Sequence, residues 1–84
     1  MSYHGVTIAS ASLTGLPINQ VGFDLPIEAL GILRTDAPYY YRGAEKGESE
    51  SDFCSRIVAN LEQLILEEGP DTIAAFIAEP ITGA

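Results

Sequence analysis

The sequence has few of the residues that build metal centres, disulfide frameworks and nucleic-acid surfaces. Among its 84 residues are one cysteine, Cys54, and one histidine, His4, so an internal disulfide, a Cys-based metal site and a His-rich metal centre are all excluded. Four Lys and Arg residues stand against twelve Asp and Glu, a net charge of −8. This balance argues against a general nucleic-acid binder and against docking on anionic membranes, because few cations are available to neutralise phosphates.

Long apolar runs are missing as well. No run approaches the roughly 18 apolar residues of a transmembrane helix, and the N-terminus lacks the pattern of a signal peptide. Yet 46% of the residues are hydrophobic and 19% are charged, which is too apolar for intrinsic disorder. We therefore expect a soluble, cytoplasmic α/β piece of one small domain at most. Its abrupt ends, close to Tyr3 and after Glu79, predict a segment truncated on both sides.

The clearest predicted element is an amphipathic helix from about Ser51 to Glu68. Residues Ser49 to Asp52 offer N-cap candidates with acids in the first turn, and Gly69-Pro70 supplies the stop signal. Apolar residues recur at helical spacing: Phe53, Ile57, Leu61, Leu64 and Ile65.

A short, continuously apolar run from Thr72 to Ala78 follows the helix. Turn signals bound it, which predicts a strand buried on both faces, as in a parallel sheet. A helix, a turn and a buried strand make half of a βαβ unit, so the fold class is α/β. Ligands of such sheets bind beyond the carboxyl ends of the strands, where Glu79 stands. Its carboxylate is either a cofactor or active-site acid, or it caps nearby backbone or pairs with an arginine.

The first half of the chain is less clear. Residues 6–14 fit both the alternation of a strand and the stripe of a helix, so both remain open. Residues 16–47 are punctuated by Pro and Gly and predict a long connection without long regular elements, with a possible short strand at Ile32 to Thr35. Tyr39, Tyr40 and Tyr41 in this connection either line a pocket or cover the edge of the core.

Other residues that could carry chemistry give weak signals. Tyr3-His4-Gly5 combines a flat aromatic, a titratable ring and a residue that permits close backbone approach, so it is either a stacking site for a planar ligand or an ordinary loop. Lys46, the only lysine, lies among acids in a polar loop, and we interpret it as a surface residue. Cys54 lies among acids in the first turn of the helix and is interpreted as unreactive. Neither GxGxxG nor GxxxxGK[ST] occurs.

Two motifs together resemble a known family. The first is Ser-Tyr-His-Gly at residues 2–5, followed by residues 7–15. The second is Phe-Ile-Ala-Glu-Pro-Ile-Thr-Gly-Ala at residues 76–84. In these two places the chain resembles the class III aminotransferases, which are pyridoxal-phosphate enzymes of fold type I. The ω-amino acid:pyruvate branch is the most similar. The resemblance covers essentially all of residues 1–84. It implies that the chain is an interior fragment of the large, cofactor-binding domain of a homodimer, and that Val6 to Thr14 form a helix.

The resemblance also implies roles for individual residues. Tyr3 matches the aromatic that stacks on the pyridine ring of pyridoxal 5'-phosphate, and His4 and Gly5 match the residues beside it. Glu79 matches a glutamate near the pyridine side of the cofactor. A loop by the substrate pocket matches Thr82, Gly83 and Ala84.

Other parts of the family pattern are absent. The phosphate-binding turn would precede Tyr3, whereas the aspartate at the pyridine nitrogen and the Schiff-base lysine would follow Glu79, and Lys46 does not match that lysine. The resemblance implies a parent enzyme that transfers an amino group from an amine or ω-amino acid to a keto acid such as pyruvate, and a segment that is inactive alone. The alternative is a non-catalytic truncated product or a structural or binding module.

Overall fold

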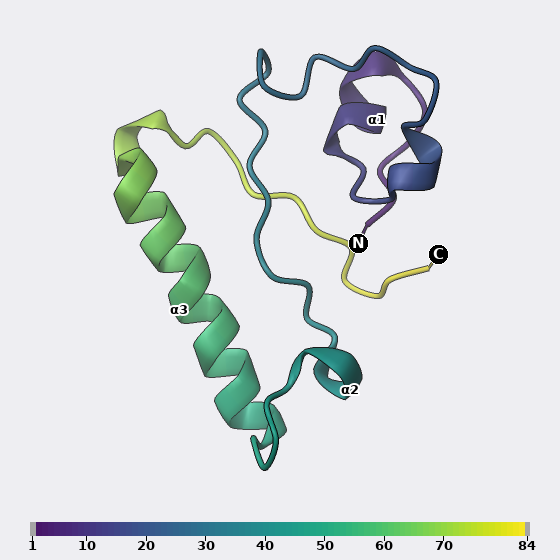
Figure 1. Cartoon of the computed structure of the whole chain (residues 1–84). Helices are drawn as coiled ribbons and strands as arrows, with labels where there is room; N and C mark the ends of the chain where they lie inside the picture. Colours follow the sequence, from purple (N-terminus) through teal and green to yellow (C-terminus); the bar gives the residue numbers. More distant parts are fainter. Residues whose placement is uncertain (1, 84) are drawn as a thin grey trace. The chain divides into compact units, whose positions relative to one another are not determined.

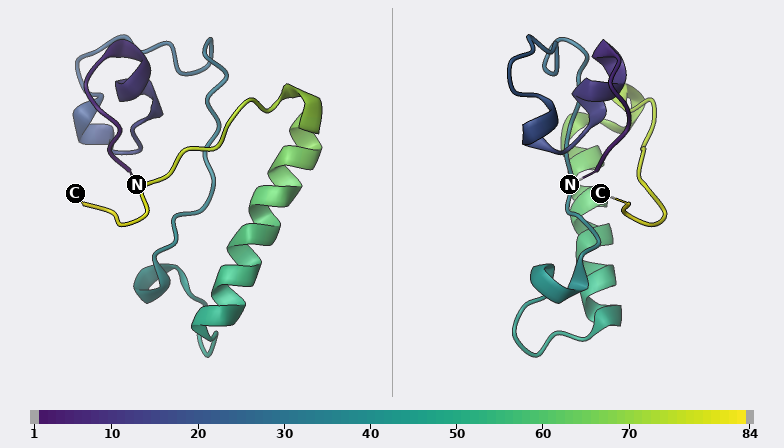
Figure 2. Two further views of the ribbon diagram at one scale, coloured as in Figure 1. Left: turned by 180° about the vertical axis from the view of Figure 1, so that it is seen from behind. Right: turned by 90° about the vertical axis from the view of Figure 1, so that its right-hand side faces the viewer.

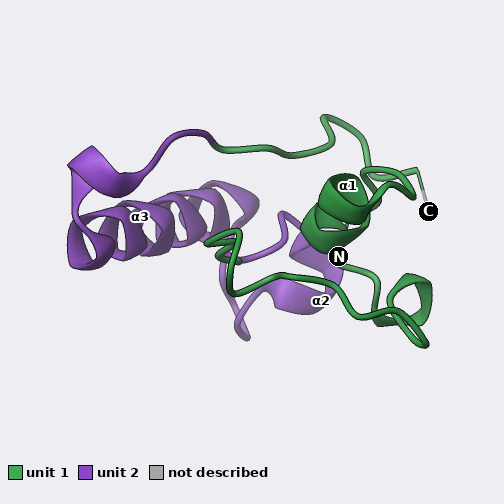
Figure 3. Ribbon diagram, turned by 90° about the horizontal axis from the view of Figure 1, so that it is seen from above, with its two compact units in different colours: residues 1–34, 76–84 green, residues 35–75 purple. Residues whose placement is uncertain are grey.

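The computed structural model describes residues 2–83 and divides the chain into two compact units (Figure 3). Unit 1 consists of residues 1–34 and 76–84, and unit 2 of residues 35–75. The elements in chain order are the helices α1 (Ile8–Leu13), α2 (Tyr40–Gly43) and α3 (Glu50–Glu68), with the 3-10 turns η1 (Pro17–Asn19) and η2 (Pro70–Thr72) after α1 and α3 (Figure 1).

Helix α1 begins at a reciprocal cap. The Thr7 hydroxyl accepts the Ser10 N–H at 3.2 Å, and the Ser10 hydroxyl accepts the Thr7 N–H at 2.9 Å. This capping box satisfies two backbone donors that a helix start leaves free. It resolves the ambiguity of residues 6–14 and confirms the helix that the family resemblance implied.

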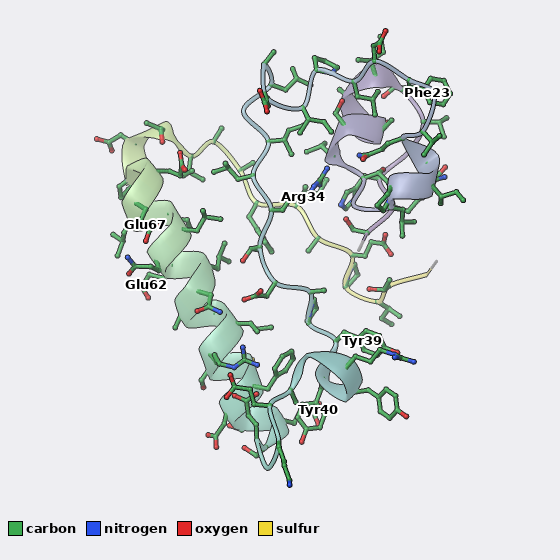
Figure 4. The ribbon with its side chains drawn as sticks, viewed as in Figure 1. Phe23, Arg34, Tyr39, Tyr40, Glu62 and Glu67 are labelled. Carbon is green, nitrogen blue, oxygen red and sulfur yellow. The ribbon has the colours of Figure 1, made fainter. Side chains whose placement is uncertain are left out.

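The C-terminal end of α1 is capped by two side chains from later in unit 1. Arg34 donates from its two terminal nitrogens to the carbonyls of Leu13 and Ser12, each at 2.9 Å (Figure 4). Gln20 Nε2 donates to the carbonyls of Ala11 and Thr14. A helix of six residues is too short to be stable in water by itself, so these caps supply much of what holds α1 in place.

Helix α3 begins within one residue of the predicted start and ends at Glu68 as predicted. The Ser49 hydroxyl accepts the Asp52 N–H at the N-cap, and Gly69 ends the helix at a φ of 95° that favours glycine. The helix is continuous from both directions of view in Figure 2. No helix among residues 2–83 is long and apolar enough to cross a membrane.

Unit 2 is organised around Phe53 on the first turns of α3. Phe53 is 4% exposed, and its ring packs against Tyr40 of α2 with centroids 5.7 Å apart. The Arg56 guanidinium lies 5.4 Å from the Phe53 centroid and pairs with Glu48 at 2.9 Å. Arg56 also donates to the carbonyl of Gly43, the last residue of α2. One aromatic side chain and one ion pair thus join α2, its following loop and α3.

The predicted buried strand from Thr72 to Ala78 is not formed in this chain. Thr72 belongs to η2, the following residues have no regular secondary structure, and Phe76 and Ile77 are 63% and 52% exposed. A strand is defined by its hydrogen-bonded neighbour, and residues 2–83 contain no strand that could pair with this one. The possible strand at Ile32 to Thr35 is absent for the same reason, and the α/β architecture is not confirmed by the described residues.

Candidate functional site

Unit 1 brings together the two motifs that stand at opposite ends of the sequence. The carboxylate of Glu79 accepts the backbone N–H of Tyr3 through Oε1 at 2.5 Å and that of Gly83 through Oε2 at 2.9 Å. Tyr3 and Glu79 are 76 positions apart, and Figure 3 shows the two segments in the colour of one unit. The predicted site residues Tyr3, Glu79 and Gly83 are therefore neighbours.

These contacts keep Glu79 ionised. The Tyr3 N–H, followed by the Gly83 N–H, holds the pKa of Glu79 below the ordinary glutamate value, while partial burial opposes this and the charge of His4 adds to it. Of the two roles left open for Glu79, the capping of nearby backbone is therefore formed. Each carboxylate oxygen has a second lone pair, so a further donor can still approach Glu79.

Thr14 holds the same turn from the other side. Its hydroxyl is fully buried, accepts the His4 N–H at 3.0 Å and donates to the Ser10 carbonyl at 2.9 Å. The Gly15 N–H donates to the Ser2 carbonyl at 2.7 Å. Residues 2–4 are thus tied to the end of α1. The sequence pattern did not mark Thr14 as a site residue; its place directly before the glycine that follows a short helix was the available signal.

Gly5 has a local structural reason to be glycine. Its φ is +122°, a value that other residues rarely adopt, and a Cβ there would lie 2.7 Å from the Ser10 hydroxyl. The backbone of Gly5 thus lies close to the first turn of α1, and its close approach to a ligand stays a prediction.

The side chains of the site remain accessible. The Tyr3 ring is 41% exposed, His4 is half-buried, and Thr82 and Gly83 are exposed, whereas Ala84 lies outside the described residues. The site therefore offers an accessible aromatic ring on a backbone that is fixed by a carboxylate and a buried hydroxyl. Such a ring can stack on a flat ligand.

Unit 2 contains a separate hollow of about 550 Å³ between α2 and the start of α3. Its lining residues are Tyr40, Tyr41, Ala44, Glu45, Gly47, Glu48 and Ser49. Tyr40 covers the edge of the Phe53 core and donates its hydroxyl to the Glu48 carbonyl at 2.6 Å (Figure 4), while Tyr41 is largely exposed. Tyr40 thus has both predicted roles, Tyr41 lines the hollow, and Tyr39 is not among the lining residues. Lys46 is exposed, as interpreted from the sequence, and Cys54 is exposed as well.

Comparisons with known proteins connect this arrangement to one family. No family model matches the chain. The mitochondrial gamma-aminobutyrate transaminase 1 of Solanum lycopersicum is 58% identical over 83 residues, which cover 99% of this chain and 16% of that protein. The omega transaminase of Pseudomonas jessenii, solved as a thermostable 6-fold mutant, is 61% identical over 98% of this chain, with a TM-score of 0.90. The chain is homologous to a segment of the class III aminotransferases.

The chain matches only part of the length of these relatives. The segment spans 16% of the length of the curated relatives and 18% of the P. jessenii chains. The P. jessenii enzyme has also been solved in complex with PMP, with 60% identity and a TM-score of 0.89 to this chain. The fold of the segment is therefore that of part of a transaminase, and the resemblance drawn from the two motifs is confirmed.

Proposed function

We propose that the chain supplies part of the cofactor-binding domain of a pyridoxal-phosphate-dependent transaminase. The observation that carries the proposal is the joining of the Tyr3 motif and the Glu79 motif in unit 1, with the Tyr3 ring accessible. In this proposal residues 1–84 belong to the large domain of a homodimer. The complex of the P. jessenii enzyme with PMP supports the choice of cofactor.

The described residues fit pyridoxal phosphate in their chemistry. When bound, this cofactor supplies the electron sink for amino-group transfer. The Tyr3 ring stacks on the flat pyridine, with His4 and Gly5 beside it. Glu79 lies near the pyridine side in this proposal, and its carboxylate holds the backbone that carries the Tyr3 ring.

Thr82 and Gly83 lie on the substrate side in this proposal. The Gly83 N–H is held by Glu79, so the loop around it is connected to the cofactor motif. The substrates are an amine or ω-amino acid as donor and a keto acid such as pyruvate as acceptor. The names of the relatives, which are gamma-aminobutyrate and omega transaminases, support this class of donor.

The segment alone is proposed to be inactive. Its only lysine, Lys46, is exposed in a loop between α2 and α3, beside Glu45, and nothing desolvates its amine. A lysine that forms a Schiff base needs desolvation or a cationic neighbour, and the exposed position of Lys46 beside Glu45 provides neither. The second candidate is a non-catalytic structural or binding module, in which no Schiff-base lysine is needed.

A chimaera separates the two candidates. The matching segment of the P. jessenii omega transaminase is replaced by this chain, and cofactor absorbance and amino transfer to pyruvate are measured. The transaminase proposal expects both to be retained. A folded chimaera that binds no pyridoxal phosphate would contradict it and favour the binding module.

A matched pair of variants tests the role of Tyr3. In the chimaera, Tyr3→Ala should weaken cofactor affinity by about 2- to 13-fold, the equivalent of an aromatic pair worth about 0.5–1.5 kcal/mol. Tyr3→Phe keeps the ring and should stay close to the unmodified affinity. Equal affinities of the Ala and Phe variants would argue against stacking.

A cytoplasmic location remains a prediction, since the plant relatives are named as mitochondrial or chloroplastic.

A further inference from the structure

The carboxylate of Glu79 joins two backbone segments that no other described hydrogen bond of residues 2–83 connects. One oxygen accepts from Tyr3 and the other from Gly83, so neither contact competes with the other. Both donors are backbone N–H groups, so the two links are independent of the side chains at positions 3 and 83. Bonds from an N–H to an ionised carboxylate are about twice as strong as neutral ones.

The segment that carries Tyr3 needs such a constraint. Residues 2–5 have no regular secondary structure, so no helix or sheet bonds hold their backbone. The Tyr3 ring makes none of the aromatic contacts found among residues 2–83, so its direction follows from its backbone. That backbone is fixed at the next residue by Thr14 and at its own N–H by Glu79.

We propose that Glu79 is a positioning residue, whose carboxylate fixes the backbone of Tyr3 and the backbone of the loop at Gly83 relative to one another. The part of this inference that concerns a stacked cofactor rests on the proposed function above. The positioning itself does not, because it concerns contacts within this chain. Glu79 then acts on a ligand of Tyr3 through the backbone of Tyr3.

The chemistry of glutamine makes the inference testable. The side chain of Glu79→Gln has one carbonyl oxygen and an NH₂ group that cannot accept, so it replaces only one of the two oxygens that separately accept from Tyr3 and Gly83. The variant also has no carboxyl proton to gain or lose in the acid range. Glu28→Gln is the matched control, because Glu28 is exposed in the same unit and its carboxylate accepts none of the described hydrogen bonds.

The amide resonances of Tyr3 and Gly83 in the ¹⁵N-labelled chain report the contact directly. As the pH falls, both should move with a single common midpoint, below the ordinary glutamate pKa of about 4.3. The charges of His4 and of the N-terminus also act on Glu79, so the step is assigned to the Glu79 carboxyl by a variant that lacks this carboxyl. The common acid step should be lost in Glu79→Gln and kept in Glu28→Gln.

Three results would overturn the inference: amides that do not respond, amides with different midpoints, or a common step that survives in Glu79→Gln. None of them depends on a cofactor, so they are distinguishable from a failure of the proposed function. In the chimaera, Glu79→Gln should weaken cofactor affinity when Tyr3 is present and should add nothing to Tyr3→Ala. Additive losses would show that Glu79 acts on the cofactor without Tyr3 and would overturn the positioning role.

Discussion

Replacing Thr14 by valine should loosen the turn that carries Tyr3 while preserving the shape of the side chain. Valine has a methyl group in place of the hydroxyl, so the part-buried His4 N–H loses its acceptor. The Ser10 carbonyl also loses the Thr14 hydroxyl but keeps the Thr14 N–H at 3.0 Å. One unsatisfied donor therefore remains, which costs about 1–3 kcal/mol.

Amide hydrogen exchange of His4 measures this cost. A loss of about 1–3 kcal/mol should increase the exchange rate by roughly 5- to 150-fold, because exchange follows the free energy of local opening. Thr14→Ser is the matched control: it keeps the hydroxyl and loses one buried methyl, worth about 0.8 kcal/mol. An equal or slower rate in Thr14→Val than in Thr14→Ser would refute the assignment of Thr14 as the support of this turn.

Three further predictions concern unit 2. Phe53→Ala should cost about 3–5 kcal/mol of unfolding free energy, measured by denaturant titration, because it removes the one large buried side chain described in the unit. Ser49→Ala should cost about 0.5–2 kcal/mol and reduce the helical circular dichroism signal, whereas Ser49→Asp should retain it. The pKa of Glu48 is lowered first by the side-chain hydrogen bond of Arg56 and then by the N–H of Glu45. The stabilisation of the folded chain by the Arg56–Glu48 pair is therefore complete above the ordinary glutamate pKa and is lost as the pH falls through the lowered value. In Arg56→Gln the titration midpoint of the Glu48 carboxyl, followed by NMR, should move up. An unchanged midpoint would contradict the pairing.

Local signals explain which elements were predictable. Helix α3 carries its information within its own residues: the Ser49 cap, the apolar period and the Gly69-Pro70 stop. Helix α1 carries a local signal too, in Thr7 and Ser10, but its apolar pattern also fits a strand, and its C-terminal caps come from Gln20 and Arg34. The short α2 was not predicted because it is a single turn of helix in a stretch rich in glycine and proline, which predicts no regular element.

Distant contacts explain what the sequence did not show. The apolar run from Thr72 to Ala78 has the composition of a buried strand, but its pairing partner is not among residues 2–83. Position alone marked Glu79 as a residue that needs a partner. That the partners are the backbones of Tyr3 and Gly83 depends on the fold, since no pattern links positions 76 apart.

The interleaved order of the two units has a consequence for biosynthesis. Unit 2 occupies one continuous stretch, residues 35–75, so it can fold as soon as that stretch leaves the ribosome. Unit 1 needs its last segment, and the Tyr3–Glu79 contact closes a loop of 76 positions, which folds slowly because of its high contact order. During translation, the Tyr3–Glu79 contact can therefore form only after residues 35–75 have been made, whereas the Tyr40–Phe53 contact of unit 2 needs no residue outside that stretch.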